Sequence, residues 1–293
     1  MPTEPVPPLS EEQVAQFRDQ GYLLLENALE PEILSGLNSD FDHWVEESRE
    51  HSDSYGSQLD GRPRFSLEPG HSCEHPALRR IASPQELSEK YLEVVRNSKA
   101  VDAVAQLIGP NIRFNNAKIN SKHPGTATEV KFHQDFMFEP HSNDDLITVL
   151  YFLGDLTPEN GPLEIVPGSH RGPLHELWHD GKFTGAVSEG ISASTGSDAI
   201  PCYGDAGSAC LMHTRLLHGS APNLSDSPRT LYIVEYCAED AHPLQANHIP
   251  SKQAREVVRG VETYRVRCSP YEMIMPEFPG GASFFEQQSR LKQ

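Results

Sequence analysis

The stretch that decides the fold is residues 130–137, which read Val-Lys-Phe-His-Gln-Asp-Phe-Met. We expect this stretch to lie on a strand of about residues 129–137. On a strand, residues i and i+2 point to the same face, so His133 and Asp135 can present an imidazole and a carboxylate to one ion. The stretch therefore predicts two of the three ligands of a facial metal triad.

A third ligand is expected from a histidine on a strand that is distant in sequence. His218, in Leu216-Leu-His-Gly-Ser220, follows His133 by 85 residues (218 − 133 = 85) and precedes a turn. Two neutral imidazoles and one carboxylate hold Fe(II) on one face and leave about three positions for a chelating co-substrate and O₂. The spacing thus predicts an iron site that could activate oxygen.

A chelating 2-oxo acid needs a cationic partner for its far carboxylate, which a planar guanidinium supplies best. Arg229 begins the next expected strand, and a turn through Pro222-Asn-Leu-Ser brings that strand back beside His218. Taken alone, Arg229 fits a surface strand position equally well. Together with the three ligands, it predicts a co-substrate anchor.

From residue 111 onward, the chain consists of short segments that are either apolar or alternate between apolar and polar residues. Gly, Pro and Asn separate these segments, which is typical of an all-β sandwich or barrel. Strands are expected at roughly 112–121, 129–137, 146–154, 162–166, 207–213 and 229–238. The first third is mainly helical. Its helices are expected over about 11–20, from Pro31 past Trp44, and from near Pro84 to Gly109 with a break at Asn97-Ser98, with a buried strand at Tyr22–Leu25 and a polar loop at 46–62.

Composition narrows the class of protein. The 293 residues carry 24 basic and 42 acidic side chains, a formal charge of −18 that disfavours nucleic acid as a partner. No apolar run approaches the ~20 residues of a membrane span, and the start of the chain has no basic or apolar signal region. Five widely spaced cysteines without C-x-x-C predict reduced thiols. These features predict a cytoplasmic protein that does not bind membranes.

The order and spacing of the motifs resemble the phytanoyl-CoA dioxygenase (PhyH) family of Fe(II)- and 2-oxoglutarate-dependent oxygenases, including bacterial members such as ectoine hydroxylase. The matching segments are Gly21-Tyr-Leu-Leu-Leu25, Asn120-Ser-Lys-His-Pro-Gly125, His133-Gln-Asp135, Asn160-Gly-Pro-Leu163, Val166-Pro-Gly-Ser-His-Arg171, His218-Gly-Ser220 and Arg229. The resemblance implies a mainly β fold with flanking helices, namely a double-stranded β-helix (jelly roll, cupin-like). It also implies one domain over 1–293, with a helical part at about 10–110, a β-helix core at about 111–240 and a C-terminal extension at about 241–293.

The same resemblance assigns roles to residues. It places Fe(II) on His133, Asp135 and His218, and the distal carboxylate of 2-oxoglutarate on Arg229. Further positions that help to hold the co-substrate in relatives correspond to Lys118, Asn120, Thr148 and Ser220. The implied activity is hydroxylation of a C–H bond of a small-molecule substrate with O₂, releasing succinate and CO₂. Asp135 indicates that the enzyme is not a halogenase, because related halogenases have a small residue at this position. The substrate and the oligomeric state are not predicted.

Two other functions compete with this one. His175-Glu-Leu-Trp-His179 is a literal H-E-x-x-H, which on a helix would hold zinc with Glu176 as general base. Its surroundings, a loop soon after Pro173, lack the periodicity of a supporting helix, and Lys182 and Gly185 occupy positions that a metzincin needs as Gly and His. The second alternative is a cupin-like metal-binding protein without oxygenase activity.

Three segments have open roles. Glu139, Asp144 and Asp145 are read either as solvated loop acids or as a charge that favours a cationic, amine-bearing substrate. The long connection from Arg171 to Ala206 is a candidate lid, in which Trp178 and Phe183 shape or cover the substrate cavity. The last segment, 269–293, contains the apolar residues Met273, Met275, Phe278, Phe284 and Phe285. Either these residues dock on the core, or the segment frays.

Overall fold

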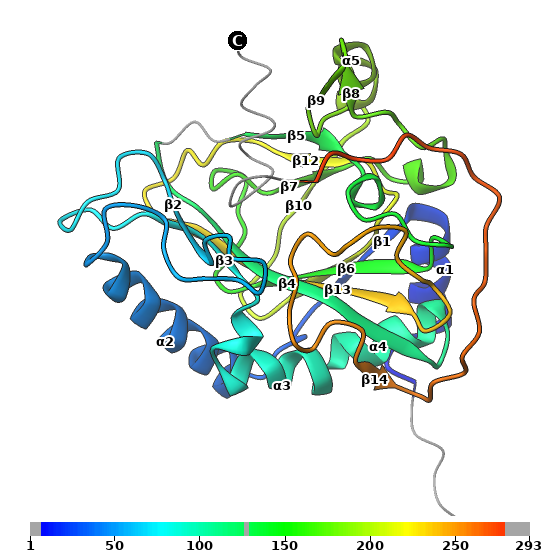
Figure 1. Cartoon of the computed structure of the whole chain (residues 1–293), viewed down its shortest axis with the longest axis horizontal. Coiled ribbons are helices and arrows are strands. Elements are labelled where there is room, and N and C mark those ends of the chain that lie inside the picture. Colours follow the sequence, from blue (N-terminus) through cyan, green and yellow to red (C-terminus); the bar gives the residue numbers. More distant parts are fainter. Residues whose placement is uncertain (1–6, 126–128, 279–293) are drawn as a thin grey trace, which may run out of the picture.

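Two antiparallel sheets face each other and form a jelly roll, as expected from the sequence (Figure 1). The computed structural model describes residues 7–125 and 129–278. The larger sheet contains, in order, β1 (Tyr22–Leu25), β11 (Ala209–His213), β6 (Leu146–Phe152), β13 (Arg229–Ala238), β4 (Ile112–Lys122), β3 (Leu78–Ala82) and β2 (Phe65–Leu67), with β14 (Val257–Arg259) paired to β4. The smaller sheet contains, in order, β10 (Ile200–Cys202), β7 (Leu163–Ile165), β12 (His218–Ser220) and β5 (Val130–His133).

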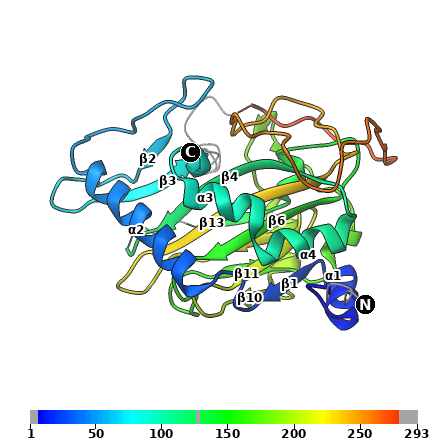
Figure 2. The same ribbon diagram turned by 90° about the horizontal axis from the view of Figure 1, so that it is seen from below.

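The helices lie mainly on one side of the molecule. Seen from below, α2, α3 and α4 cross the outer face of the larger sheet (Figure 2). The α-helices are α1 (Glu11–Gln20), α2 (Pro31–Ser48), α3 (Glu89–Asn97), α4 (Lys99–Ile108) and α5 (Glu189–Gly196). The short 3₁₀ helices are η1 (Pro84–Glu86), η2 (Asp135–Met137) and η3 (Ser169–Arg171). Among the described residues, no helix is long and apolar enough to cross a membrane.

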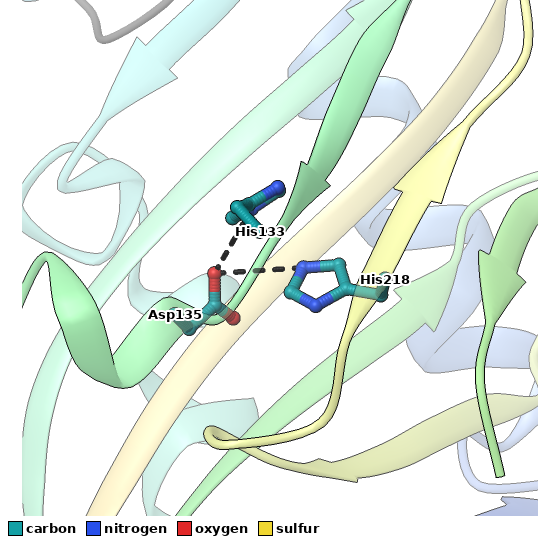
Figure 3. A group of neighbouring side chains, drawn as sticks. All are labelled: His133, Asp135 and His218. Carbon is teal, nitrogen blue, oxygen red and sulfur yellow. Dashed lines mark ion pairs between the residues drawn. The ribbon is translucent and has the colours of Figure 1, made fainter. Parts of the chain in front are cut away.

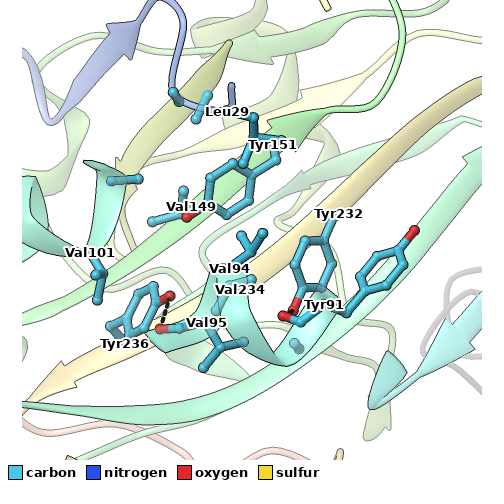
Figure 4. Close-up of a cluster of buried hydrophobic side chains, with 14 of the residues drawn as sticks. Leu29, Tyr91, Val94, Val95, Val101, Val149, Tyr151, Tyr232, Val234 and Tyr236 are labelled. Carbon is cyan, nitrogen blue, oxygen red and sulfur yellow. Dashed lines mark hydrogen bonds between the residues drawn. The ribbon is translucent and has the colours of Figure 1, made fainter. Parts of the chain in front are cut away.

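The central strands bury both faces because they separate two apolar layers. On β13, Tyr232 and Tyr236 face the helices, whereas Leu231 lies between the two sheets. A buried tyrosine needs a partner for its hydroxyl. Tyr232 donates to the carbonyl of Tyr91 on α3 at 3.1 Å, and Tyr236 donates to the carbonyl of Val95 at 2.9 Å (Figure 4). These bonds fix α3 against the sheet and leave the inner face of β13 for the site.

The predicted break in the long helical stretch is confirmed. Ser98 has an extended backbone (φ −92°, ψ 158°) and caps α4 by accepting a hydrogen bond from the Val101 amide. Its hydroxyl also lies 2.7 Å from the Tyr151 hydroxyl on β6. Because an N-cap residue cannot continue the preceding helix, the stretch splits into α3 and α4.

The N-terminal helix ends where the sequence predicts. Gly21 follows α1 with φ +80°, in the left-handed region that glycine adopts at little cost. A Cβ at this position would meet the side chain of Leu216 at 2.8 Å. Both the conformation and the close approach therefore require glycine here, and β1 starts at the next residue.

Several boundaries differ from the sequence prediction. The short strands β2, β3, β8 (Trp178–His179), β9 (Lys182–Phe183), β10, β12 and β14 were missed, because two to five residues carry too little periodicity. Helix α2 continues to Ser48, inside the segment expected to be a loop from residue 46. The connection 171–206 starts at the last residue of η3 and contains the β8–β9 hairpin, α5 and β10, so it is more ordered than a simple loop.

Candidate active site

The site starts at the end of β5, where the strand gives way to η2. The expected strand of residues 129–137 is too long: it ends at His133, and Asp135 opens a 3₁₀ helix. Gln134 between them keeps an extended backbone (φ −117°, ψ 125°). The alternation of a strand therefore continues for one more residue, so His133 and Asp135 still point to the same side.

The third group of the site comes from the neighbouring strand of the smaller sheet. His218 is the first residue of β12 and is directly paired with His133 in the antiparallel register of β12 and β5. Gly219 permits this approach, because a Cβ there would lie 2.8 Å from the carbonyl oxygen of Val130. The His218-Gly219 pair of the sequence thus brings the imidazole to the metal site.

These three side chains converge (Figure 3). The Oδ1 atom of Asp135 lies 3.4 Å from Nε2 of His133 and 3.6 Å from Nε2 of His218. One ligand atom from each residue lies within 4.8 Å of the others. Within residues 7–125 and 129–278, these three residues form the group of His, Cys, Asp or Glu side chains that could hold a metal ion. The donor set of two imidazoles and one carboxylate is the facial set that suits Fe(II).

Hydrogen bonds orient each of the three groups. Nδ1 of His133 lies 2.8 Å from the carbonyl of Lys131, and Nδ1 of His218 lies 3.0 Å from the carbonyl of Leu216. A carbonyl can only accept, so Nδ1 carries the hydrogen and Nε2 keeps its lone pair for a metal. Both rings are therefore in the tautomer that ligation requires.

The charge states also suit a cation. Burial and the neighbouring His133 lower the pKa of His218 to about 4, although Asp135 opposes this. Burial by itself would raise the pKa of Asp135, but the adjacent His218 and His133 outweigh it and hold that pKa well below its usual range. The site consequently offers a neutral imidazole and an ionised carboxylate near neutral pH, which are the forms that bind a metal.

A cavity of about 80 Å³ opens beside the three ligands. His133, Asp135 and His218 lie on its wall, together with apolar residues of β6 and β13 such as Leu150 and Leu231. Its remaining charged wall residues are mostly basic, namely Arg79, Lys118, Lys122 and Arg229, with Glu68 as an acid. A dianionic co-substrate fits such a wall.

Arg229 lies at the entry of β13 and is buried, with 6% of its surface exposed. Its Nη2 donates to the carbonyl of Gly161 at 2.9 Å, whereas its buried Nε has no hydrogen-bond partner. Burial lowers the pKa of Arg229 to about 10, so the guanidinium stays charged at neutral pH. A buried cation with a donor to spare is the group that a bound carboxylate would satisfy.

Lys122 is a site residue that the sequence reasoning missed. It is opposite Arg229 in the β4–β13 register, and its Nζ donates to the Ser220 hydroxyl at 2.7 Å. Burial and, next, the positive Arg229 lower the pKa of Lys122 to about 7. The signal was in the sequence: Lys118, Asn120 and Lys122 alternate on one strand and so share a face.

The other residues expected at the co-substrate lie as follows. Lys118, Asn120 and Ser220 line the larger cavity, and the Oδ1 atom of Asn120 is buried without a hydrogen-bond partner. Thr148 also lies on the wall, but its hydroxyl donates to Oδ2 of Asp135 at 2.9 Å. Its contact is thus to an iron ligand, whose second oxygen it holds away from the two imidazoles.

A second, smaller cavity of about 20 Å³ also borders Asp135. It shares Lys118, Asp135, Thr148 and Ile233 with the first, and its other wall residues are Asn116, Phe138, Glu139, Glu235 and His248. Glu139 is buried here, with its Oε1 atom 2.5 Å from Nδ1 of His248. The reading of Glu139 as a solvated loop acid is therefore wrong.

The two other acids of that sequence stretch have structural partners. Asp144 is paired with Arg215 at 2.6 Å, and Asp145 is paired with Arg267. Neither lies on the wall of the two cavities. Only Glu139 of the three contributes its charge to the site.

The H-E-x-x-H motif does not have the geometry of a zinc site. His175 and Glu176 lie in a loop, and His179 ends the two-residue strand β8, so the imidazoles are not one helical turn apart. Nε2 of His179 lies 2.8 Å from the carbonyl of Ala186, and Glu176 is exposed. The motif serves the β8–β9 hairpin, and the expectation that it lacks a supporting helix is confirmed.

The hairpin and the C-terminal segment pack near the site. Phe183 of β9 packs edge-on against Phe138 at 5.7 Å, and Phe138 packs edge-on against His133 at 5.5 Å. The C-terminal segment docks through Tyr271, which packs against Phe136 at 5.3 Å, and through the Met275 carbonyl, which accepts from the Trp178 indole at 3.0 Å. Phe284 and Phe285 lie outside the described residues. Phe183 thus reaches His133 only through Phe138, and neither Trp178 nor Phe183 lies on the wall of the two cavities, so their role as a cover of the substrate cavity stays a prediction.

A jelly roll with a His-Asp-His group on its inner wall and an arginine nearby defines a class, the non-haem iron dioxygenases that depend on 2-oxoglutarate. The family model "Phytanoyl-CoA dioxygenase (PhyH)" matches residues 17–231 of the chain. The chain belongs to the phytanoyl-CoA dioxygenase (PhyH) family, and its cofactors are Fe(II), 2-oxoglutarate and O₂.

Similarity to individual proteins agrees with this family assignment. A "Probable alpha-ketoglutarate-dependent hypophosphite dioxygenase" of Stutzerimonas stutzeri is 33% identical over 96% of this chain and 98% of its own length. The L-proline trans-4-hydroxylase of Streptomyces griseoviridis is 29% identical over 69% of this chain and 83% of its own length. The crystal structure of EctD from S. alaskensis with 2-oxoglutarate and 5-hydroxyectoine shares the fold, with a TM-score of 0.68, 20% identity and coverage of 91% of this chain and 90% of that one.

Proposed function

We propose that this dioxygenase hydroxylates a C–H bond of a small molecule and that His133, Asp135 and His218 hold its iron. The observation that carries the assignment is the convergence of the three ligand atoms within 4.8 Å, with Nδ1 of each histidine against a backbone carbonyl. When bound, Fe(II) supplies O₂ activation coupled to decarboxylation of 2-oxoglutarate to succinate and CO₂. Asp135 occupies the position that would have to be vacant for a halide, which favours hydroxylation.

In this proposal the basic end of the larger cavity binds 2-oxoglutarate. Arg229 donates its unpartnered Nε and its charge to the distal carboxylate, and Lys122 adds a second positive charge from the adjacent strand. Asn120 and Ser220 lie on the same wall. Anchoring the far end of the molecule directs its 2-oxo acid end toward the ligands.

The apolar part of the same wall has a separate role. Leu150, Leu163, Leu231 and Ile233 exclude water around the co-substrate. Thr148 positions Asp135 through its hydrogen bond.

The remaining parts of the proposal concern organisation and location. Helices α2, α3 and α4 and parts of the segment 241–278 pack on the β-core, which supports a single domain (Figures 1 and 2). A small-molecule partner, without nucleic acid or membrane, agrees with the formal charge of −18. The five cysteines are free thiols, which supports a cytoplasmic location.

The deciding experiment supplies the purified protein with Fe(II), ascorbate, 2-oxoglutarate and O₂ and measures succinate. Succinate that requires both iron and 2-oxoglutarate supports the proposal. Its absence, together with failure of 2-oxoglutarate to bind the iron-loaded protein under anaerobic conditions, would instead favour a cupin-like binding protein. Peptide cleavage that depends on zinc would revive the protease alternative.

A further inference from the structure

Gln134 lies between two of the assigned metal ligands, and its side chain points away from the metal site. The alternation that turns His133 and Asp135 to one side turns Gln134 to the other. The residue is buried, with 0% of its surface exposed. A buried amide needs partners for its hydrogens and its oxygen, and the partners of Gln134 are backbone groups.

These backbone groups belong to two other segments of the chain. Nε2 of Gln134 donates to the carbonyl of Arg215 at 2.8 Å and to the carbonyl of Pro173 at 3.2 Å. Its Oε1 accepts from the amide of His175 at 2.8 Å. Arg215 lies in the turn just before the ligand His218, whereas the other two residues lead into the β8–β9 hairpin. One side chain thus joins both ligand-bearing segments to the base of the hairpin.

The far end of the hairpin segment is attached to the same strand. The amide of Val187 donates to the carbonyl of Phe132 on β5 at 2.9 Å. Phe132 and Gln134 are the two neighbours of His133 in the sequence. The hairpin segment 173–187, which lies next to β5 in Figure 1, is therefore bonded to the chain on both sides of one ligand. A displacement of this segment would act directly on the position of that ligand.

Other hydrogen bonds hold the turn before β12 against the same parts. Nη2 of Arg215 donates to the carbonyl of Gly172 at 2.6 Å, and its Nη1 is paired with Asp144 at 2.6 Å. The amide of Phe136 donates to the carbonyl of Thr214 at 2.9 Å. Gln134 is the side chain at the centre of these contacts, because it bonds to the turn and to the hairpin segment at once.

We propose that Gln134 is a positioning residue of the iron site, which fixes the two ligand-bearing segments relative to each other and couples them to the hairpin segment 173–187. The inference rests on the proposed function, since it takes the three assigned side chains as the iron ligands. Because its side chain points away from the site, Gln134 acts through those ligands. The H-E-x-x-H stretch then contributes the backbone amide of His175, and not its imidazole, to the organisation of the site.

The first test measures binding of Co(II), used in place of Fe(II), by calorimetry and by visible absorption. Gln134→Met keeps the length of the side chain but lacks the amide. The variant should bind Co(II) about ten- to a hundred-fold more weakly, as for other partners of metal ligands, and its absorption bands, which report ligand geometry, should change. A merely structural role would lower the melting temperature and leave both measurements unaltered.

Gln106→Met is the matched control for this variant. The amide of Gln106 also bonds to backbone groups, namely the amide and the carbonyl of Leu9 at 2.9 Å, and it joins α4 to the start of the chain. The same loss of an amide therefore occurs at a place that has no contact with the ligand-bearing segments. Gln106→Met should keep the Co(II) affinity and the absorption bands of the unmodified protein.

Hydrogen exchange provides a second test, which the unmodified protein answers even if Gln134→Met does not fold. Coupling between two sites is reciprocal, so metal binding should in turn stabilise the hairpin segment 173–187. Co(II) should therefore slow the exchange of its amides, that of His175 included, more than the exchange in α2, which reports any general stabilisation. In a folded Gln134→Met this difference should be lost.

The outcomes separate the inference from the proposed function. Unchanged Co(II) affinity and absorption in Gln134→Met overturn the inference, and so does exchange in 173–187 that Co(II) slows no more than in α2. Asp135→Ala, measured alongside, tests the ligand assignment. If Asp135→Ala loses Co(II) while Gln134→Met keeps it, only the inference fails. If Asp135→Ala binds Co(II) as tightly as the unmodified protein, the assigned metal site is wrong and the inference fails with it.

Discussion

His133 and His218 face each other directly across the β5–β12 strand pair, with ring centroids 4.2 Å apart. Each ring is held by the carbonyl two residues before it, at Lys131 and at Leu216. The two imidazoles thus have the same local geometry on two strands that are distant in sequence. Both ligand nitrogens are oriented by the backbone before any metal binds, which lowers the cost of ordering them.

The first prediction concerns these ligands. His218→Ala and Asp135→Ala should each abolish iron-dependent succinate formation and weaken metal binding measured by calorimetry, while the protein stays folded. Removing one of three protein ligands breaks the facial set that holds Fe(II). His175→Ala, a change in the H-E-x-x-H segment, is the matched control and should leave both measurements unaltered. Full activity in either ligand variant would refute the assigned metal site.

The second prediction concerns the co-substrate anchor. Arg229→Ala should raise the 2-oxoglutarate concentration needed for half-maximal turnover by about ten- to a hundred-fold, because a charge-assisted bond of about 1.5–3 kcal/mol is lost. Metal binding in the absence of 2-oxoglutarate should be unchanged. Arg171→Ala, which removes a surface pair with Asp19, serves as the control. An unchanged 2-oxoglutarate requirement would place the anchor elsewhere.

The third prediction is a pH dependence. Lys122, with its pKa lowered to about 7, is charged below that pH and loses its proton above it in the free protein. A nearby carboxylate favours the charged form, so binding of 2-oxoglutarate should take up a proton above pH 7 and weaken as pH rises. The dissociation constant, measured by calorimetry, should increase by up to about ten-fold per pH unit until the pKa of the complex is reached.

Lys122→Met is the variant that tests this dependence. Methionine keeps an unbranched side chain but carries no titrating group. The variant should bind 2-oxoglutarate more weakly below pH 7 and show a flatter pH profile than the unmodified protein. If the profile of the variant is as steep as that of the parent, another group is responsible for it.

The fourth prediction concerns Thr148 as a positioning residue. Thr148→Val removes the hydroxyl that donates to Asp135 and should reduce metal affinity by about ten- to a hundred-fold, as for other partners of metal ligands. Thr148→Ser keeps the hydroxyl and should restore most of the affinity. A co-substrate role would instead change the 2-oxoglutarate requirement and leave metal affinity intact. Measuring both constants in both variants distinguishes the two roles.

The fifth prediction concerns the core that supports the site. Tyr236→Phe keeps the ring but loses the hydrogen bond to the Val95 carbonyl, so the free energy of unfolding should fall by about 1–2 kcal/mol. Tyr264→Phe changes an exposed tyrosine and should have little effect. Urea denaturation measures both. Equal stability of the two variants would mean that the buried bond contributes nothing to the fold.

The sequence predicted the main helices and the longer strands, because each has enough residues to show its period. The break at Ser98 was recognisable as a capping residue, and the end of α1 as a glycine. The short strand β12 was not recognised, since three residues show no pattern. The strand β12 matters for the site because it pairs with β5. That pairing is a long-range contact, which local sequence does not show.

The site was predicted only in part, again because local sequence does not show long-range contacts. His133 and Asp135 are near neighbours whose relation follows from extended backbone, and His218 followed from motif spacing. Thr148 was expected at the co-substrate, yet its hydroxyl meets Asp135. Lys122 was overlooked although it alternates with Lys118 and Asn120 on one strand; its contact with Ser220, across 98 residues, is visible only in the structure.

By itself, the sequence determined the types of side chain that could bind a metal, the family, and the alternation that gives each strand an inner face. It also supplied Arg229, the proposed co-substrate anchor. Only the tertiary structure decided which of those inner faces meet. The pairing of β4 with β13 placed a basic end around Arg229 and an acidic end around Glu235, on either side of one metal site. The reason is physical, since hydrogen-bonded register between distant strands depends on the packing of the whole chain and not on the residues beside each strand.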